Sequence, residues 1–64
     1  MNFDELMHNA KYIITMSDNY EFIGLYIKSE RGFLVFLNME DDKLIPIRPS
    51  NIKNISLVEA FANL

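Results

Sequence analysis

The residues that could perform acid–base or nucleophilic chemistry are few and isolated in this chain. His8 is its only histidine, and the chain contains no cysteine. The only side chain that could act as a base for a serine nucleophile is His8. The serines are Ser17, Ser29, Ser50 and Ser56. Because a serine nucleophile needs such a base beside it, the sequence predicts no catalytic site and no enzymatic activity. We expect His8 to be an exposed side chain on the polar side of a helix.

The acidic run Glu40, Asp41 and Asp42 is the candidate for a metal site. Three adjacent acids cannot all point at one ion, and the spaced ligands and the glycine of a calcium loop are missing. One histidine without cysteine cannot build a structural zinc site. Since Gly24 and Gly32 are the only glycines, there is no glycine-rich phosphate loop. We therefore expect no metal and no cofactor, and we expect the acidic run to form a solvated hairpin loop.

The size and composition predict a single domain over residues 1–64 that works by binding. A domain this small buries only about 60% of the surface that its unfolded chain exposes. Half of the residues are hydrophobic, and neither a disulfide nor a zinc site is available to reinforce the core. Self-association is the remaining way to stabilise so thin a core. We expect a homo-oligomer that also binds a protein partner, as a small regulator or inhibitor.

The charge balance is mildly acidic, with six Lys and Arg residues against nine Asp and Glu residues. Nucleic-acid-binding domains usually carry a basic patch or stripe. Lys43, Arg48 and Lys53 recur at five-residue spacing and could line one rim, although we expect independent surface charges. The balance favours a protein partner over RNA, and RNA binding is the alternative.

The sequence predicts a cytoplasmic protein without a membrane segment. No apolar run approaches the 18 residues of a membrane-spanning helix. The chain opens with Asp4 and Glu5, where a signal or transit peptide would carry basic residues. A chain without cysteine does not depend on an oxidising compartment.

A short helix is predicted over residues 1–10. Four apolar residues in this segment recur with helical spacing: Phe3, Leu6, Met7 and Ala10. Asn2 can cap the N-terminus, and Glu5 three residues later completes a pattern like a capping box. A helix of about ten residues is marginal alone, so we expect it to lie on the rest of the domain.

From residue 11 the pattern changes to the alternation of β-strands. Five strands are predicted, at residues 11–16, 20–29, 33–39, 44–47 and 52–57. Gly24 predicts a bulge or bend inside the second strand, and Gly32 predicts a positive φ in the following hairpin loop. Pro46 places the fourth strand at an edge or a bulge. Residues 58–64 are expected to form a short tail or a helical turn.

The third predicted strand does not alternate, so we expect it to be covered on both faces, by the helix or by a neighbouring chain. Closure of five short strands removes exposed edges. The predicted fold is therefore α+β but mostly β, with a short N-terminal helix followed by a five-stranded, strongly bent small barrel of the Sm/SH3-like type.

Two segments resemble the motifs of the Sm-like proteins, which include the bacterial RNA chaperone Hfq. The first motif is matched by a bend glycine, an acidic residue and an apolar strand that ends in acids: Phe22, Gly24, Glu30, residues 33–37 and residues 40–42. Residues 47–55 (IRPSNIKNI) resemble the second motif. The resemblance covers most of the chain, and it implies the barrel fold and assembly into a ring.

The resemblance also implies an RNA pocket made of Glu30, Phe33 and Arg48. In the family a flat side chain stacks on a base, and the arginine closes the pocket from the neighbouring subunit. Two positions depart from the family pattern. Leu34 stands where an asparagine normally binds the base edge, and Pro49 stands where a glycine normally follows the arginine.

Apolar residues that are not expected to be buried in the core are the candidates for an interface with another chain. They are Phe33, Val35, Leu44, Pro46, Val58, Phe61 and Leu64. Phe61 and Leu64 are the clearest examples, and they could pack either on their own barrel or on another chain.

Overall fold

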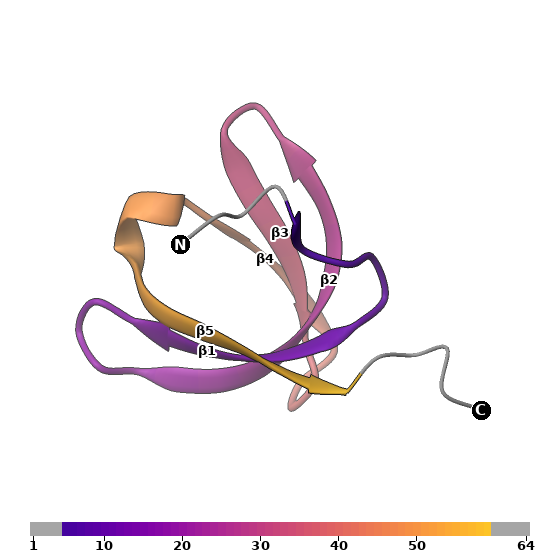
Figure 1. Ribbon diagram of the computed structural model, residues 1–64, viewed down its shortest axis with the longest axis horizontal. Helices are drawn as coiled ribbons and strands as arrows, with labels where there is room; N and C mark the ends of the chain where they lie inside the picture. Colours follow the sequence, from indigo (N-terminus) through magenta and orange to yellow (C-terminus); the bar gives the residue numbers. More distant parts are fainter. Residues whose placement is uncertain (1–4, 60–64) are drawn as a thin grey trace.

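The structure, a computed structural model, describes residues 5–59 and has five β-strands in this range. The strands are β1 (Lys11–Met16), β2 (Glu21–Glu30), β3 (Phe33–Asn38), β4 (Lys43–Ile47) and β5 (Ile52–Glu59). They form one antiparallel sheet in the order β4-β3-β2-β1-β5. A 3-10 helix, η2 (Pro49–Asn51), connects β4 to β5. Figure 1 shows that β2 curves along its length, so that β3 and β4 run across the direction of β1 and β5.

The predicted helix over residues 1–10 is wrong for the part that the structure describes. Residues 5–10 contain no α-helix, and Asn9 has a φ of 64°, which interrupts any right-handed turn. The sheet binds this backbone instead. The Asn9 N–H donates to the Tyr26 carbonyl (2.8 Å), and the Tyr26 N–H donates to the Ala10 carbonyl (3.0 Å). These bonds replace those of a helix that is marginal alone, so the domain is mostly β rather than α+β.

The five predicted strands are confirmed within a residue or two at each end, but the predicted closed barrel is wrong. Among the described residues no ladder joins β4 to β5, so these strands are the edges of an open, curled sheet. Pro46 lies in edge strand β4, as predicted. The tail predicted from residue 58 is wrong at Val58 and Glu59, which continue β5; residues 60–64 lie outside the described range.

No helix within residues 5–59 is long and apolar enough to cross a membrane.

The core lies on one face of the curled sheet and comes from alternate residues of the strands. Among the described residues, the large side chains that are fully buried in it are Ile14 and Phe36. The other buried core residues are Ala10, Tyr12, Phe22, Tyr26, Leu34 and Ile47. Other residues on this side, such as Ile45, Ile52 and Ile55, are partly buried and pack against the core. Because side chains alternate between the two faces of a strand, the residues between these positions point to the opposite side of the sheet, its outer face.

Gly24 packs closely against this core, in a strand that curves along its length, as the bend alternative predicted, but the bulge does not fall at the glycine itself. The register shift in the β2–β3 ladder falls between Tyr26 and Lys28. A Cβ atom on Gly24 would lie 3.0 Å from the Ile14 side chain and 3.1 Å from Cβ of Phe36. The glycine therefore lets three strands approach one another at the centre of the curl.

Gly24→Ala is expected to lower the free energy of unfolding by about 1–3 kcal/mol, because the added methyl group overfills a packed core. Urea unfolding followed by circular dichroism would measure the change. The control is Ser29→Ala, at an exposed position of the same strand, with an expected change within about 0.5 kcal/mol. An unchanged midpoint for Gly24→Ala would show that the core has room at this position.

Candidate functional site

The outer face of the sheet is apolar across four strands. Cα pairing places Leu25, Leu37 and Leu44 in one row across β2, β3 and β4. Ile13 and Ile23 are paired in the next row, on β1 and β2. Ile13, Ile23 and Leu44 are exposed. A contiguous apolar face of this kind is a candidate interaction surface.

A shallow groove of about 280 Å³ lies at one end of the outer face, between β2 and the β3–β4 turn. It is lined by Phe22, Ile23, Met39 and Glu40. The Met39 N–H donates to the Ile23 carbonyl (2.9 Å), which continues the β2–β3 pairing to this point. The groove therefore extends the apolar face to the end of the β2–β3 pairing.

Most of the predicted interface residues fall on this one face. Those on the outer face are Phe33, Val35, Leu44 and Pro46. Val35 is nevertheless buried, as the lack of alternation in its strand predicted. Its Cα partners are Lys28 and Pro46. Val58 is exposed on β5, and Phe61 and Leu64 lie outside the described residues.

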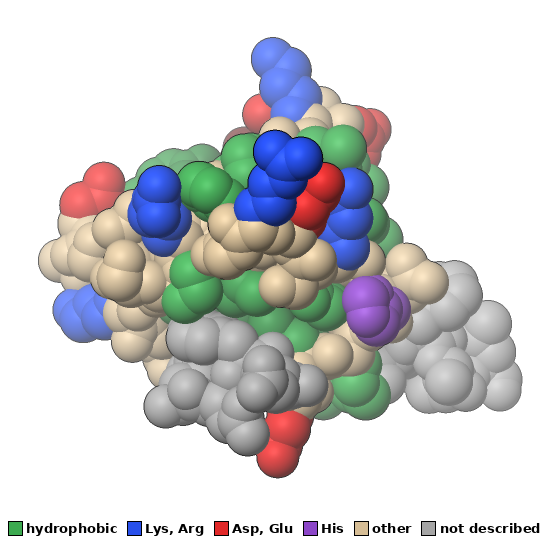
Figure 2. All heavy atoms as spheres, turned by 90° about the horizontal axis from the view of Figure 1, so that it is seen from above, with side chains coloured by type: hydrophobic (Ala, Val, Ile, Leu, Met, Phe, Trp, Pro, Cys, Tyr) green, Lys and Arg blue, Asp and Glu red, His purple; other side chains and the backbone are tan. Residues whose placement is uncertain are grey.

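The three residues of the predicted RNA pocket also lie together. The Arg48 guanidinium is 4.7 Å from the centroid of the Phe33 ring, within the range of a cation–π contact. Glu30 is the Cα partner of Phe33, and its carboxylate forms an ion pair with Lys28 (2.9 Å). Figure 2, which views the molecule from the end where the β2–β3 turn lies, shows Lys and Arg side chains on either side of an acidic one.

Two details of this cluster differ from what the resemblance implies. Arg48 contacts Phe33 of its own chain and covers part of the ring on which a base would stack. Leu34, at the position expected to face the base edge, is buried in the core. A base at this site would therefore contact the guanidinium plane or displace it, and the Leu34 side chain offers it no hydrogen bond.

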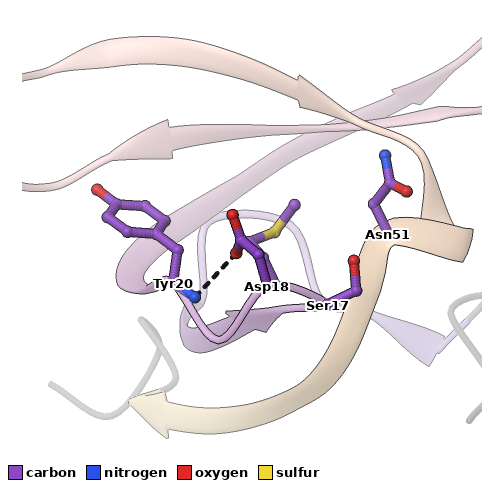
Figure 3. A pocket seen from close by; sticks show the side chains of 5 residues that line it. Ser17, Asp18, Tyr20 and Asn51 are labelled. Atoms are coloured by element: carbon purple, nitrogen blue, oxygen red, sulfur yellow. Dashed lines mark hydrogen bonds between the residues drawn. The ribbon is translucent and has the colours of Figure 1, made fainter.

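A second recess, of about 350 Å³, lies between the β1–β2 turn and η2. It is lined by Met16, Ser17, Asp18, Tyr20 and Asn51. Figure 3 shows the Asp18 carboxylate between the Tyr20 ring and the side chains of Ser17 and Asn51. The sequence predicted residues 17–19 only as a turn, and no spacing rule connects that turn to Asn51.

Backbone hydrogen bonds hold the walls of this recess in place. The Ser17 N–H donates to the Asn51 carbonyl (2.8 Å), which joins the β1–β2 turn to η2. The Tyr20 N–H donates to Oδ1 of Asp18 (2.9 Å), which fixes the orientation of the carboxylate. Lys53 donates to the Asn19 side chain at the rim (2.8 Å). The recess is therefore built into the fold before any ligand arrives.

The remaining candidates for chemistry, His8 and the acidic run, form hydrogen bonds with the backbone. Nδ1 of His8 lies 2.8 Å from the Ile27 carbonyl, and since a carbonyl only accepts, this nitrogen carries a proton. In the acidic run, Asp41 accepts a hydrogen bond from the Lys43 N–H (3.1 Å). The side chains that the structure describes include no group of three or more metal-ligating residues.

Comparison with protein-family models, curated proteins and solved structures gave no match for this chain. The assignment to the Sm-like proteins therefore stays a prediction that rests on the two motif-like segments. The candidate binding surfaces among the described residues are the apolar outer face, the Phe33–Arg48 cluster and the recess beside η2.

Proposed function

We propose that this chain is a non-enzymatic binding module, a small acidic regulator or inhibitor that works in the cytoplasm as a homo-oligomer. The observation that carries the proposal is the apolar outer face of β1–β4, to which Ile13, Ile23 and Leu44 contribute exposed side chains. An exposed face of this kind becomes favourable once another surface covers it. The module binds partners and performs no reaction.

A second copy of the chain is the occupant that fits this face best. The face is flanked by both signs of charge, with Lys11 beside Leu25 and the pair Lys28–Glu30 beside Val35. A two-fold axis can therefore bring opposite charges together around an apolar centre. The thin core of a 64-residue domain gains from the same contact.

Sedimentation velocity over a range of concentrations tests the proposal. Species heavier than the 7.5 kDa monomer are expected to grow with protein concentration. A monomer at all concentrations up to the high micromolar range would contradict self-association. A charge placed on the outer face, as in Leu44→Glu, would then assign the contact to that face.

RNA binding is the second candidate, and the contact between Phe33 and Arg48 favours it. An aromatic ring with a guanidinium on it can contribute stacking energy of roughly 1–3 kcal/mol per base. Lys28 adds a second positive charge near this end of the sheet. These features resemble the remaining parts of an Sm-type pocket.

Fluorescence polarisation with short U-rich and A-rich RNA separates the two candidates. If RNA is the ligand, micromolar binding that weakens with salt is expected. Arg48→Ala should then reduce affinity by about tenfold, and Arg48→Lys should recover only part of it, because lysine keeps the charge without the planar stack. Lys53→Ala, which removes a charge elsewhere, is the control. RNA that stays unbound at low salt would leave protein binding as the function.

A further inference from the structure

We infer that the recess between the β1–β2 turn and η2 binds the guanidinium group of an arginine side chain from a basic segment of a partner protein. The inference deepens the proposed function, because it names the chemistry of the partner. It uses a surface separate from the outer face, which is proposed for self-association.

The first argument is the set of oxygen atoms that the recess presents. Oδ1 of Asp18 is engaged by the Tyr20 N–H, while Oδ2 has no hydrogen bond within residues 5–59. The hydroxyl of Ser17 and the side-chain amide of Asn51 are likewise not engaged by any side chain in that range. A guanidinium group carries five N–H donors and no acceptor, so it matches a carboxylate flanked by neutral oxygens.

The second argument is the aromatic wall. Tyr20 as a residue is 52% exposed, and its ring stacks on that of Phe22 with ring centroids 5.9 Å apart. Phe22 belongs to the core, so it holds the Tyr20 ring in a defined orientation. A planar cation can lie on such a ring while it pairs with a carboxylate beside the ring.

The charges around the recess favour a cation over an anion. Asp18 lines the recess, and Glu21 lies just outside it, bound to the Thr15 hydroxyl (3.2 Å). The nearby positive charge, Lys53, is bound to Asn19. The protein as a whole carries a net charge of −3. Phosphates of a nucleic acid would meet the Asp18 carboxylate, whereas a basic peptide segment is attracted to it.

The test uses the full chain labelled with ¹⁵N and titrated with the tripeptide acetyl-Gly-Arg-Gly-amide. The same titration is run with citrulline, which keeps the shape without the charge, and with lysine, which keeps the charge without the fork. Saturable shifts of the amide signals of Ser17, Tyr20 and Asn51 are expected with the arginine peptide. Binding of the lysine and citrulline peptides is expected to be at least about fivefold weaker.

Asp18→Asn is expected to weaken arginine binding by at least about tenfold. The asparagine oxygen can still accept from the Tyr20 N–H, so the turn is preserved. Glu21→Gln removes the same charge three residues away and should change affinity by less than about twofold. Equal losses for Asp18→Asn and Glu21→Gln, equal binding of arginine and citrulline peptides, or no saturable shift would each overturn the inference.

The inference and the proposed self-association can fail separately. Leu44→Glu lies on the outer face, away from the recess. If the recess binds arginine, this variant should bind the peptide with unchanged affinity whether it is a monomer or an oligomer. Loss of peptide binding in Leu44→Glu, with the fold retained, would contradict the assignment of binding to the recess.

Discussion

Leu44→Glu is expected to abolish self-association at concentrations where the unmodified protein is oligomeric. Leu44 is 61% exposed on β4, in the same outer-face row as Leu37. In a two-fold interface the substitution occurs twice, and each new carboxylate would be buried against apolar side chains. The dissociation constant should rise about 100-fold or more. In sedimentation velocity the protein should then run as the 7.5 kDa monomer.

Leu57→Glu is the matched control for this experiment. Leu57 is also an exposed leucine on an edge strand, at 51% exposure on β5. Its Cα partner is Tyr12, whose side chain belongs to the core face, so Leu57 is not part of the outer face. Leu57→Glu should leave the oligomer intact. If both variants dissociate the oligomer equally, the interface is formed by the edge strands, or the added negative charge acts wherever it is placed.

Phe36→Ala is expected to unfold most of the protein at 25 °C. Phe36 is fully buried and lies at the centre of the core, with its ring centroid 5.5 Å from that of Tyr26. Removing a buried phenylalanine side chain costs about 3–5 kcal/mol. The single core of a domain this small rarely supplies more than about 3–5 kcal/mol of stability, so the loss is comparable with the whole free energy of unfolding. Circular dichroism during urea titration should show a greatly reduced or absent folded baseline.

Phe33→Ala tests whether this loss belongs to the core and not to phenylalanine removal in general. Phe33 is on the same strand but on the outer face, and it is only partly buried. Its replacement should lower the free energy of unfolding by about 1 kcal/mol, consistent with the partial burial of its ring. If both variants unfold equally, the outer face contributes as much to stability as the core does.

The strands could be predicted from the sequence because their signals are local. Alternation, β-branched residues and turn residues mark each strand, and Gly32 has the positive φ of 82° that its loop position predicted. The helix prediction rested on the spacing of apolar residues within the first ten positions, which is also a local signal. It failed because the hydrogen bonds that this segment forms instead are to a distant part of the chain. Asn9 and Ala10 form hydrogen bonds with Tyr26, far along the chain. This pairing cannot be predicted from the pattern of the first ten residues.

The candidate surfaces likewise depend partly on local sequence signals and partly on contacts between distant segments. Phe33, Val35, Leu44 and Pro46 could be selected from sequence, since apolar residues on an edge strand or on a non-alternating strand exceed what the core can use. Their gathering on one face depended on the register between β3 and β4, which the structure supplies. The recess could not be predicted, because Asp18 and Asn51 meet only through the path of η2 beside the β1–β2 turn.

The pairing of β1 with β5 has a consequence for synthesis of the protein on the ribosome. Three of the four ladders join strands that follow one another in the chain, so they can form as each hairpin leaves the ribosome. The fourth joins the first strand to the last, with Ile14 opposite Ile55. Until β5 emerges, β1 is an open edge beside a partly covered core, so the nascent chain is most open to chaperones and to mispairing in that interval.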